Sequence, residues 1–514
     1  MTPVVKPVGS RAVIVDLPDL DAVMDWYSAL SAEPLEHQTD VVAAARTVLI
    51  TFDSPAAAAT AAAALPGFSP AAAERATPRD IEIEVRYDGA DLDSLAESLG
   101  MTRDSLVDWH TSTTWVAAFG GFAPGFTYCV PEDGNGLSIP RLATPRTEVP
   151  AGAVALAGEF SAVYPRTSPG GWQLVGTTHT PMWDSAASPP ALVAPGDRVR
   201  YRAVDTFAES HGPSHHHLER PARRPIFTVD DPGLHTLYQD LGRQGNGNLG
   251  VTTSGSADRA SARTANAAVG NKRNATLLEN VGGCRLTALA ETVVCVTGAE
   301  ADVTVGGRPA LLATPTIVPA GAELVISAPR AGMRSYVAVR GGLIADTELG
   351  SAATDLLSGL GPAPITAGET VSMSLTPPMS ANALLTNPLR VAQEKGVTVG
   401  TVRCVLGPRD DWFSTETVER FLATDYTVTP ASNRVGLRLE AAAPLERERP
   451  GELPSEGMVA GSVQIPPSGQ PVVFLRDHAV TGGYPVIATV INEDVDIAAQ
   501  LPPGSTLRFE LYSR

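Results

Sequence analysis

Lysine is nearly missing from this 514-residue sequence, which has three lysines among 38 basic residues. Lys6, Lys272 and Lys395 are isolated, and none of them lies between two methionines. Chemistry that depends on an activated lysine is therefore almost excluded. For the same reason we expect no biotin attachment site in this chain.

Cysteine and long apolar runs are also scarce. The four cysteines are far apart and form no CxxC pair, which argues against a disulfide framework and against a thiolate zinc site. No stretch approaches the roughly 18 apolar residues of a membrane span. The amino terminus lacks the basic region, apolar block and cleavage site of a secretion signal. We therefore expect a cytoplasmic protein with no membrane segment and no bound metal.

Positive charge is in deficit, because the formal net charge is −18 at pH 7. This balance argues against a nucleic-acid partner and against docking on anionic lipid. Two hydrolase motifs, G-x-S-x-G and H-E-x-x-H, are absent as well. The glycine-rich run DLGRQGNGNLG (240–250) contains no GxxxxGK followed by Ser or Thr, so no ATP site is visible in the chain.

What is present indicates a mainly β protein with an α/β subdomain at its amino terminus. Residues 1–85 alternate strand-like stretches with helix-like ones, as in RAVIVDL (11–17) and the alanine-rich segment 55–65. Short strands that follow Pro- and Gly-containing turns dominate the remainder. We expect a β-barrel over 86–207 and two β-barrel subdomains within 226–514.

Residues 208–225 separate these two halves. The segment AESHGPSHHHLERPARRP is polar, contains three prolines and shows no hydrophobic periodicity, which predicts a linker. Its histidines 211, 215, 216 and 217 allow a metal site in principle. A solvated connector is the favoured interpretation, because no carboxylate or cysteine nearby completes a closed site.

The segment TSGSADRASARTANAAVGN (253–271) predicts a helix with chemistry on one face. Asp258 and Asn266 are eight residues apart on that face, with the small Ala262 between them. A notch of this kind admits a polar ligand, with Asp258 as a catalytic candidate and Asn266 as a substrate-binding one. A capping aspartate and a surface asparagine explain the pattern equally well.

A third group of candidates lies in the last hundred residues. Arg434 has the forked donors that clamp a carboxylate, and Asp477 follows it in a Pro- and Gly-rich context. Gln464 and Tyr484, the latter in TGGYP, are candidates for substrate binding. A buried Arg434–Asp477 ion pair that orders loops is an equally weighted alternative.

Two candidates remain in the first half. His110 follows a predicted helix, where satisfying the helix carboxyl terminus is favoured over general-base catalysis. The loop FGGFAPGFTYC (119–129) crowds glycines beside phenylalanines. Pro124–Gly125 fits a type II turn, and Gly120–Gly121 leaves the backbone bare for a close approach. We expect this loop to face a ligand, with Phe122 excluding water.

Longer motifs resemble two known families. GGFAPGFTY (120–128) and PRTEVPAGAVALAGEFSAVYPRTSPGGWQLVGTT (145–178) resemble the B subunit of 5-oxoprolinase, also called KipI-like. SNRVGLRL (432–439) and SEGMVAGSVQIPPSGQPVVFLRDHAVTGGYP (455–485) resemble the C subunit, or KipA-like. The same pair of modules forms the carboxyltransferase region of urea carboxylase and urea amidolyase. The chain thus resembles a fused B–C protein, which implies cyclophilin-like barrels in both halves.

The resemblance also implies an activity and a partner. It implies ATP-dependent opening of 5-oxoproline to glutamate, carried out with a separate A subunit of the LamB/YcsF type. On residue chemistry, Arg434 would bind the substrate carboxylate, the backbone of 120–125 the oxyanion, and Asp258 the water. Two alternatives are a biotin-dependent carboxyltransferase acting on urea-like amides and a regulatory module that inhibits a sensor kinase. A homo-oligomer is compatible with all three.

Overall fold

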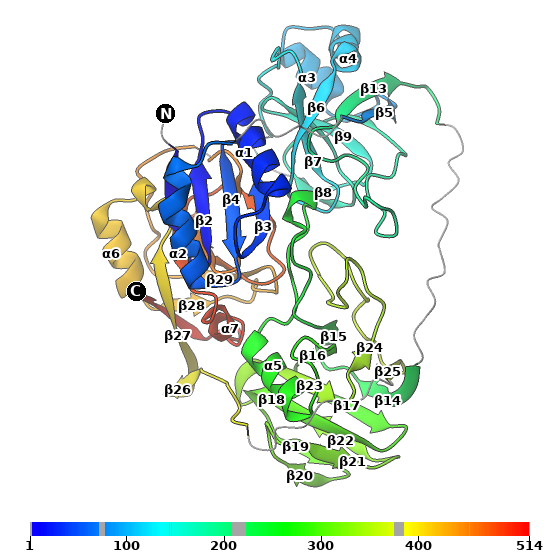
Figure 1. The fold of residues 1–514 in the computed structure, drawn as a ribbon, viewed down its shortest axis with the longest axis vertical. Coiled ribbons are helices and arrows are strands. Elements are labelled where there is room, and N and C mark those ends of the chain that lie inside the picture. The colour runs from blue at the N-terminus through cyan, green and yellow to red at the C-terminus, as the bar shows by residue number, and fades with distance from the viewer. Residues whose placement is uncertain are drawn as a thin grey trace.

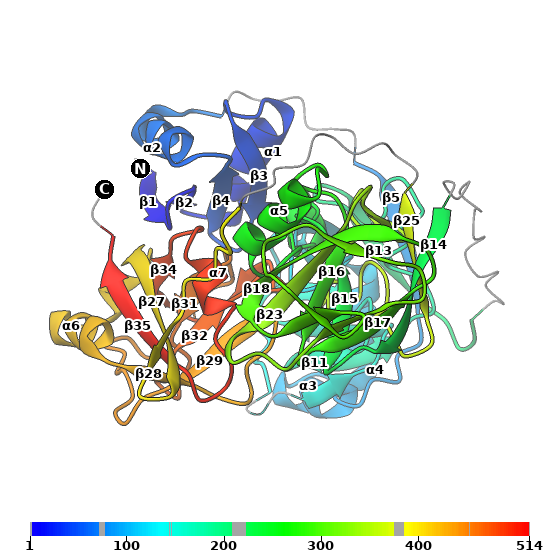
Figure 2. The ribbon, with the colours of Figure 1, turned by 90° about the horizontal axis from the view of Figure 1, so that it is seen from below.

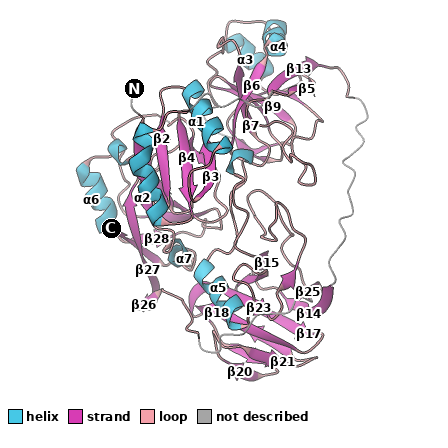
Figure 3. Cartoon of the chain, viewed as in Figure 1, coloured by secondary structure: helices cyan, strands magenta, loops and turns pink. Residues whose placement is uncertain are grey.

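The computed structural model describes residues 3–70, 78–142, 144, 146–207, 223–374, 385–451 and 453–512. The chain is mainly β, with an α/β subdomain at the amino terminus and barrel-like sheets in both halves, as the sequence predicts (Figures 1 and 3). Most of the predicted linker, residues 208–222 with His211, His215, His216 and His217, lies outside the described residues. Within the described ranges, no helix is both long enough and apolar enough to cross a membrane.

The amino-terminal subdomain is a four-stranded antiparallel sheet in the order β1-β2-β4-β3 with two helices. Its strands are β1 (Val4–Val8), β2 (Ala12–Asp16), β3 (Gln38–Ala43) and β4 (Thr47–Phe52), and its helices are α1 (Leu20–Ala32) and α2 (Pro55–Ala64). Asp19 and Ser54 cap the two helices by accepting backbone N–H groups three residues on. Both helices cover the same face of the sheet (Figure 1), where a short 3₁₀ turn, η1 (Leu65–Gly67), follows α2.

A closed barrel follows in the first half. Seven strands run in the order β12-β9-β10-β7-β6-β13-β5, and a bridge between Arg86 and Thr177 joins the two outer strands. The strands are β5 (Asp80–Val85), β6 (Trp115–Gly120), β7 (Thr127–Pro131), β9 (Ala153–Ala157), β10 (Phe160–Val163), β12 (Gln173–Thr177) and β13 (Arg198–Ala203). Beside it lie α3 (Leu92–Ser98), α4 (Arg103–Ser112) and the pair β8 (Arg146–Val149) and β11 (Ser168–Gly170).

Strand β5 differs from the sequence-based assignment. The sequence places residues 80–85 at the end of the amino-terminal subdomain. In the structure β5 pairs in parallel with β13, from Asp80–Arg198 to Val85–Ala203. Its inward side chains, such as Ile83 and Val85, belong to the barrel core. Residue alternation predicts a strand at this point, but it carries no information on which sheet the strand joins.

The second half begins with two sheets packed around one core. One has seven strands in the order β20-β19-β22-β17-β14-β25-β24, and the other has five in the order β15-β16-β23-β18-β21. The strands are β14 (Arg223–Asp231), β15 (His235–Gln239), β16 (Leu277–Val281), β17 (Cys284–Ala288), β18 (Thr292–Glu300), β19 (Val303–Val305), β20 (Arg308–Ala310), β21 (Thr316–Val318), β22 (Glu323–Ile326), β23 (Ala331–Val339), β24 (Leu343–Ile344) and β25 (Thr370–Ser374). Helix α5 (Arg259–Ala268) follows η2 (Gly247–Leu249) and packs on β18 and β23.

The chain ends in a second closed barrel. Its strands run in the order β27-β34-β31-β32-β29-β28-β35, and a parallel pairing of β27 with β35 closes it, with β26 added at one side. The strands are β26 (Ala392–Glu394), β27 (Val397–Leu406), β28 (Tyr426–Val428), β29 (Gly436–Glu440), β31 (Ser462–Gln464), β32 (Val472–Phe474), β34 (Val486–Val490) and β35 (Thr506–Leu511). The remaining elements are η3 (Asp410–Trp412), α6 (Thr415–Ala423), α7 (Val495–Ala498) and the pair β30 (Glu456–Gly457) and β33 (Thr481–Gly482).

The two ends of the chain pack against each other. The amino-terminal sheet lies beside the carboxy-terminal barrel in both views (Figures 1 and 2). Ile14 and Leu49, on the face opposite the helices, are in one buried cluster with Val480. Arg409 then bridges Asp16 and Glu456, with 2.7 Å from its Nε to Glu456 Oε1. These contacts join the amino-terminal sheet to the carboxy-terminal barrel, and we call the region where the two halves of the chain meet the junction.

Candidate functional site

The loop 119–129 lies at the junction between the halves. Gly125 has φ +78°, as a type II turn requires at its third position, and Phe122 has φ +62°. The N–H of Gly125 donates to Leu249 O (3.0 Å), and the N–H of Phe122 donates to Thr481 Oγ1 (3.3 Å). Both acceptors belong to the second half of the chain.

The two glycines of this loop lie against other parts of the protein and do not face open space. A Cβ on Gly120 would overlap the carbonyl oxygen of Asn248, and one on Gly121 would lie 2.7 Å from Thr481 Oγ1. The N–H groups of residues 121 and 123 donate within the loop, to Phe126 O and Gly121 O. The backbone donors expected to face a substrate oxygen are thus engaged with protein, and the loop docks the two halves.

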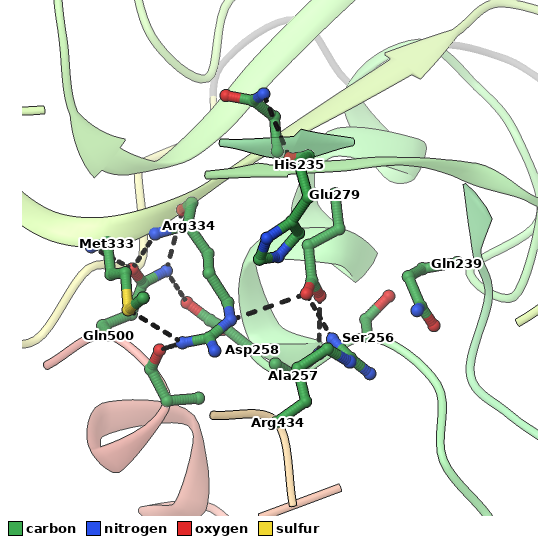
Figure 4. A network of polar contacts seen from close by, with 12 residues as sticks. His235, Gln239, Ser256, Ala257, Asp258, Glu279, Met333, Arg334, Arg434 and Gln500 are labelled. Atoms are coloured by element: carbon green, nitrogen blue, oxygen red, sulfur yellow. Dashed lines mark hydrogen bonds and ion pairs between the residues drawn. The ribbon is translucent and has the colours of Figure 1, made fainter. Parts of the chain in front are cut away.

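Arg434 belongs to a buried ionic network, and Figure 4 shows the part of it in which Glu279 contacts both Arg434 and Arg334. Its Nε donates to Asp477 Oδ2 (2.8 Å), its Nη2 donates to Asp477 Oδ1 (3.0 Å), and its Nη1 donates to Glu279. Arg434 is 1% exposed, and Asp477 and Glu279 are fully buried. Burial alone would lower the pKa of Arg434, but the two carboxylates raise it above its usual value. The ion-pair interpretation of Arg434 and Asp477 therefore matches the observed geometry.

The network ties the two subdomains of the second half together. Asp477 also accepts Ser254 Oγ (2.7 Å) and the N–H of Leu356 (3.1 Å). Glu279 Oε2 accepts Tyr336 Oη–H (2.9 Å) and an N–H from the loop before α5. Burial opposes ionisation of Glu279, but Arg434 and Arg334 hold its pKa below the ordinary value. Glu279 is therefore charged, and the two carboxylates together fix the position of the 254–257 loop.

Asp258 caps α5. Its Oδ1 accepts the N–H of Ser261 (2.9 Å), while its Oδ2 accepts Ser261 Oγ–H (2.6 Å) and the Nε2–H of Gln500 (2.8 Å). Burial, and then the charge of Asp496, raise the pKa of Asp258 to about 6. Both oxygens are occupied by protein donors, so the capping role is the one that the contacts support.

The remaining predicted residues lie apart from one another. His110 is buried in the first barrel, where Nδ1 contacts Tyr87 Oη (2.6 Å), Nε2 contacts Ser161 Oγ (2.9 Å), and burial lowers its pKa to about 3. Asn266 donates to Ala275 O at the end of α5. Gln464 donates to the carbonyl oxygen of Tyr484 (3.2 Å) in the second barrel. The structure does not gather these residues at one site.

A cavity of about 310 Å³ does open at the junction. Its walls come from the amino-terminal sheet, the 244–254 loop, helix α5 and the carboxy-terminal barrel. A separate cavity of about 370 Å³ is lined by Pro124 of the docking loop and by Glu348 among others. Among the described residues there is no cluster of three or more metal-binding side chains. The 310 Å³ cavity combines both halves with ionisable side chains, among them Asp40, His478 and several arginines.

Asp40 and His478 face this cavity from opposite halves of the sequence. Burial raises the pKa of Asp40 to about 6, although its carboxylate accepts the N–H groups of Gly247 (3.0 Å) and Val41 (2.9 Å). His478 Nδ1 lies 2.8 Å from Ala479 O, and Nε2 lies 3.3 Å from Thr252 Oγ1. Burial lowers its pKa to about 4, so the ring is neutral at pH 7, with the proton on Nδ1 and with Nε2 accepting from Thr252 Oγ1–H.

The same cavity is lined by arginines that the sequence did not single out: Arg11, Arg259, Arg263 and Arg476. Arg259 and Arg263 lie close to Asp258 and Asn266 in the predicted helix, and Arg476 directly precedes Asp477. A signal was thus present within a few residues of each candidate. Which face of a helix meets a cavity depends on how the rest of the chain packs against the helix. In α5 the face that lines the cavity is the one that carries Arg259 and Arg263.

Comparisons with known proteins agree with this two-part construction. The family model described as carboxyltransferase domain, subdomain A and B, matches residues 249–511, and the model for subdomain C and D matches residues 3–193. The chain is 33% identical over 282 residues to the C subunit of 5-oxoprolinase from Escherichia coli (strain K12), which covers 54% of this chain and 88% of that protein. It is 44% identical over 128 residues to the B subunit from Escherichia coli O157:H7, or 24% of this chain and 57% of that protein.

Larger proteins and one solved structure complete the comparison. Urea amidolyase of Lachancea kluyveri is 28% identical over 312 residues, and the match spans only 17% of that enzyme. The crystal structure of TTHA0988 superposes with a TM-score of 0.84 at 32% identity and covers 97% of this chain and 99% of that one. The chain therefore belongs to the carboxyltransferase-domain family and joins in one polypeptide the regions that the B and C subunits of 5-oxoprolinase carry separately.

Proposed function

We propose that this chain is the B–C component of an enzyme that opens 5-oxo-L-proline to L-glutamate at the expense of ATP. Its partner is an A subunit of the LamB/YcsF type. The observation that carries the proposal is the 310 Å³ cavity, whose walls come from the B-like and the C-like halves together. Neither half builds this cavity alone, so the site requires both halves.

The cavity offers the groups that a cyclic amide with a carboxylate requires. Arginines supply cationic donors for the acidic part of the substrate. Asp40, with a pKa raised to about 6 by burial, is poised to exchange a proton with the ring nitrogen near neutral pH. When substrate binds, His478 Nε2 would exchange its 3.3 Å contact with Thr252 Oγ1 for a water molecule and orient that water toward the amide carbon. Arg434, Asp477 and Asp258 hold the loop and helix that carry the arginines.

The glycine-rich run 240–250 does not fit a nucleotide. The N–H of Gly247 donates to the carboxylate of Asp40, and the N–H of Gly242 donates to Asp240 Oδ1 (2.7 Å). A carboxylate beside the loop repels phosphate, and the donors that would cradle phosphate are engaged. No step in this chain is therefore assigned to ATP.

Reconstitution tests the proposal. The purified chain, a LamB/YcsF-type protein, ATP and 5-oxo-L-proline are combined, and glutamate is measured. We expect glutamate only when all four are present. Asp40→Asn and His478→Gln should each lower kcat at least tenfold, whereas Arg330→Met, at an exposed ion pair with Asp302, should leave it unchanged. Absence of glutamate from the complete mixture, or full turnover by both cavity variants, would refute the proposal.

A second candidate is carboxyl transfer to a urea-like amide. The description of both matching family models and the similarity to urea amidolyase favour it. It is tested by supplying a carboxybiotin-loaded carrier with urea or another amide and following the labelled carboxyl group. Transfer that depends on this chain, without glutamate formation from 5-oxoproline, would replace the first candidate with the second.

A further inference from the structure

Three arginines form one wall of the 310 Å³ cavity. Arg259 and Arg263 are four residues apart on α5 and so share a face of the helix. Arg476 comes from the carboxy-terminal barrel and is 4% exposed. The Nε atoms of Arg259 and Arg476 are buried and have no hydrogen-bond partner in the described part of the chain. Such donors cost free energy when they are left without an acceptor.

The positive charge of this wall is only partly balanced. Arg476 pairs with Asp496 at 3.0 Å. Arg259 contacts only carbonyl oxygens, those of Leu241 (3.3 Å) and Ser254 (3.2 Å). Arg263 has no ion pair with any residue that the structure describes. Burial, and then the charge of Arg476, lower the pKa of Arg259 to about 9, which agrees with crowding of like charges. Among the described residues Asp496 is the one carboxylate in an ion pair with this wall, and the charge of Asp240 also acts on Arg259.

We propose that Arg259, Arg263 and Arg476 form a subsite for a doubly charged phosphoryl group. A dianion offsets more of the positive charge of this wall than a single carboxylate does. The unpartnered Nε–H groups of Arg259 and Arg476, together with the guanidinium of Arg263, match the three terminal oxygens of a phosphoryl group. The subsite uses side chains, in contrast to the backbone loops of nucleotide-binding motifs, which is why no such motif marks it in the sequence.

The inference deepens the proposed function, on which its biological meaning rests. Opening of an amide driven by ATP passes through a phosphorylated substrate and ends with free phosphate. A phosphoryl subsite in the same cavity as Asp40 and His478, on a different wall from Asp40, lets this chain hold the activated substrate while water attacks and the ring nitrogen is protonated. The acidic side chains of the cavity, Asp40 and Asp53, belong to the amino-terminal wall, so they do not pair with the three arginines.

The subsite is tested by titrating the full-length chain with inorganic phosphate at constant ionic strength, using calorimetry. We expect saturable binding with one site per chain. Arg263→Met should weaken it at least tenfold, and the double variant Arg259→Met, Arg263→Met should abolish it. Arg330→Met, which removes an equal charge from an exposed pair, should bind phosphate like the parent. Equal affinity for all of these variants would overturn the proposal.

Folding does not confound the result, because Arg263 is exposed and has no ion pair among the described residues. Its variant should keep the melting temperature of the parent without phosphate and lose the rise that phosphate causes in the parent. Arg476→Met is less suitable, since it leaves Asp496 buried without its partner. A parent protein whose melting temperature responds to phosphate no more than to chloride would also overturn the subsite.

Competition experiments identify the source of the phosphoryl group. Sulfate should compete with phosphate, and acetate at equal ionic strength should not. ATP that displaces phosphate with the same arginine dependence would assign the group to a nucleotide, and its failure to do so would assign it to the substrate or product. Competition by 5-oxoproline that is as strong as that of sulfate would overturn the preference for a dianion.

The test is separable from that of the proposed function. Phosphate binding is measured on this chain alone, and glutamate formation needs the partner. Phosphate binding by this chain without glutamate formation in the complete mixture would refute the proposed function and support the subsite. Turnover by a chain that binds no phosphate would do the reverse.

Discussion

Gly120, the last residue of β6 in the first half, lies directly against the carbonyl oxygen of Asn248 in the second half. There is no space between them for a Cβ. The contact is repeated in reverse, because a Cβ on Gly250 would overlap the carbonyl oxygen of Ala123. Two backbones from distant parts of the sequence thus meet at glycines, and this explains the glycine content of both loops better than a bound ligand does.

Gly120→Ala should therefore weaken the docking of the halves. Overpacking of this kind typically costs about 1–3 kcal/mol. We expect the free energy of unfolding, measured with urea, to fall by an amount in that range. We also expect the affinity of the cavity for phosphate to change. Gly67→Ala is the matched control, since nothing lies within 4 Å of a Cβ there. Parent-like stability of Gly120→Ala would show that the loops are able to separate without cost.

Arg434→Met should destabilise the chain more strongly. It leaves Asp477 buried without its cation and Glu279 with Arg334 alone, and the loss of one partner from a buried ion pair typically costs about 3–5 kcal/mol. Arg508→Met, at an exposed pair with Asp425, should cost less than about 1 kcal/mol. Urea unfolding compares the two variants. If Arg434→Met kept its stability but lost substrate binding, Arg434 would be a substrate ligand after all.

The sequence alone predicted local secondary structure and one ion pair. Alternation, turns and caps indicated the strands and the helix that Asp258 begins, and residue chemistry suggested the Arg434–Asp477 pair. It did not predict that Asp40 lies beside Gly247, more than two hundred residues away, because only folding brings β3 against that loop. Burial then changes the chemistry, as with His478, which alternation leaves indistinguishable from a surface histidine. The cavity is a property of these long-range contacts.

The role of Asp258 is tested by a pair of substitutions. Serine also caps a helix, whereas alanine does not, and loss of a cap typically costs about 0.5–2 kcal/mol. If Asp258 acts as a cap, Asp258→Ser should keep most of the turnover in the reconstituted mixture, and Asp258→Ala should lower both stability and turnover. Equal and nearly complete loss of turnover in both variants, with the stability of the serine variant preserved, would instead assign its carboxylate to catalysis.

Asp40 should give the fold a measurable pH dependence. Burial raises its pKa to about 6, whereas a carboxyl in the unfolded chain titrates near 4. Between these values the folded protein holds a proton that the unfolded chain has lost, so this group makes stability fall as the pH rises. For one proton the slope is at most about 1.4 kcal/mol per pH unit.

Asp40→Asn removes this slope, because the amide does not ionise. The variant should therefore gain free energy of unfolding relative to the parent as the pH rises from 4 to 6, and the difference should be constant above about pH 7. Urea unfolding at several pH values measures it, and carboxylates common to both proteins cancel. Asp133→Asn is a control of opposite sign, because the N–H of Asn135 holds the pKa of Asp133 below its ordinary value. A difference between Asp40→Asn and the parent that does not change with pH would mean that the Asp40 carboxylate is hydrated and ordinary, and would remove it as the proton-transfer group of the cavity.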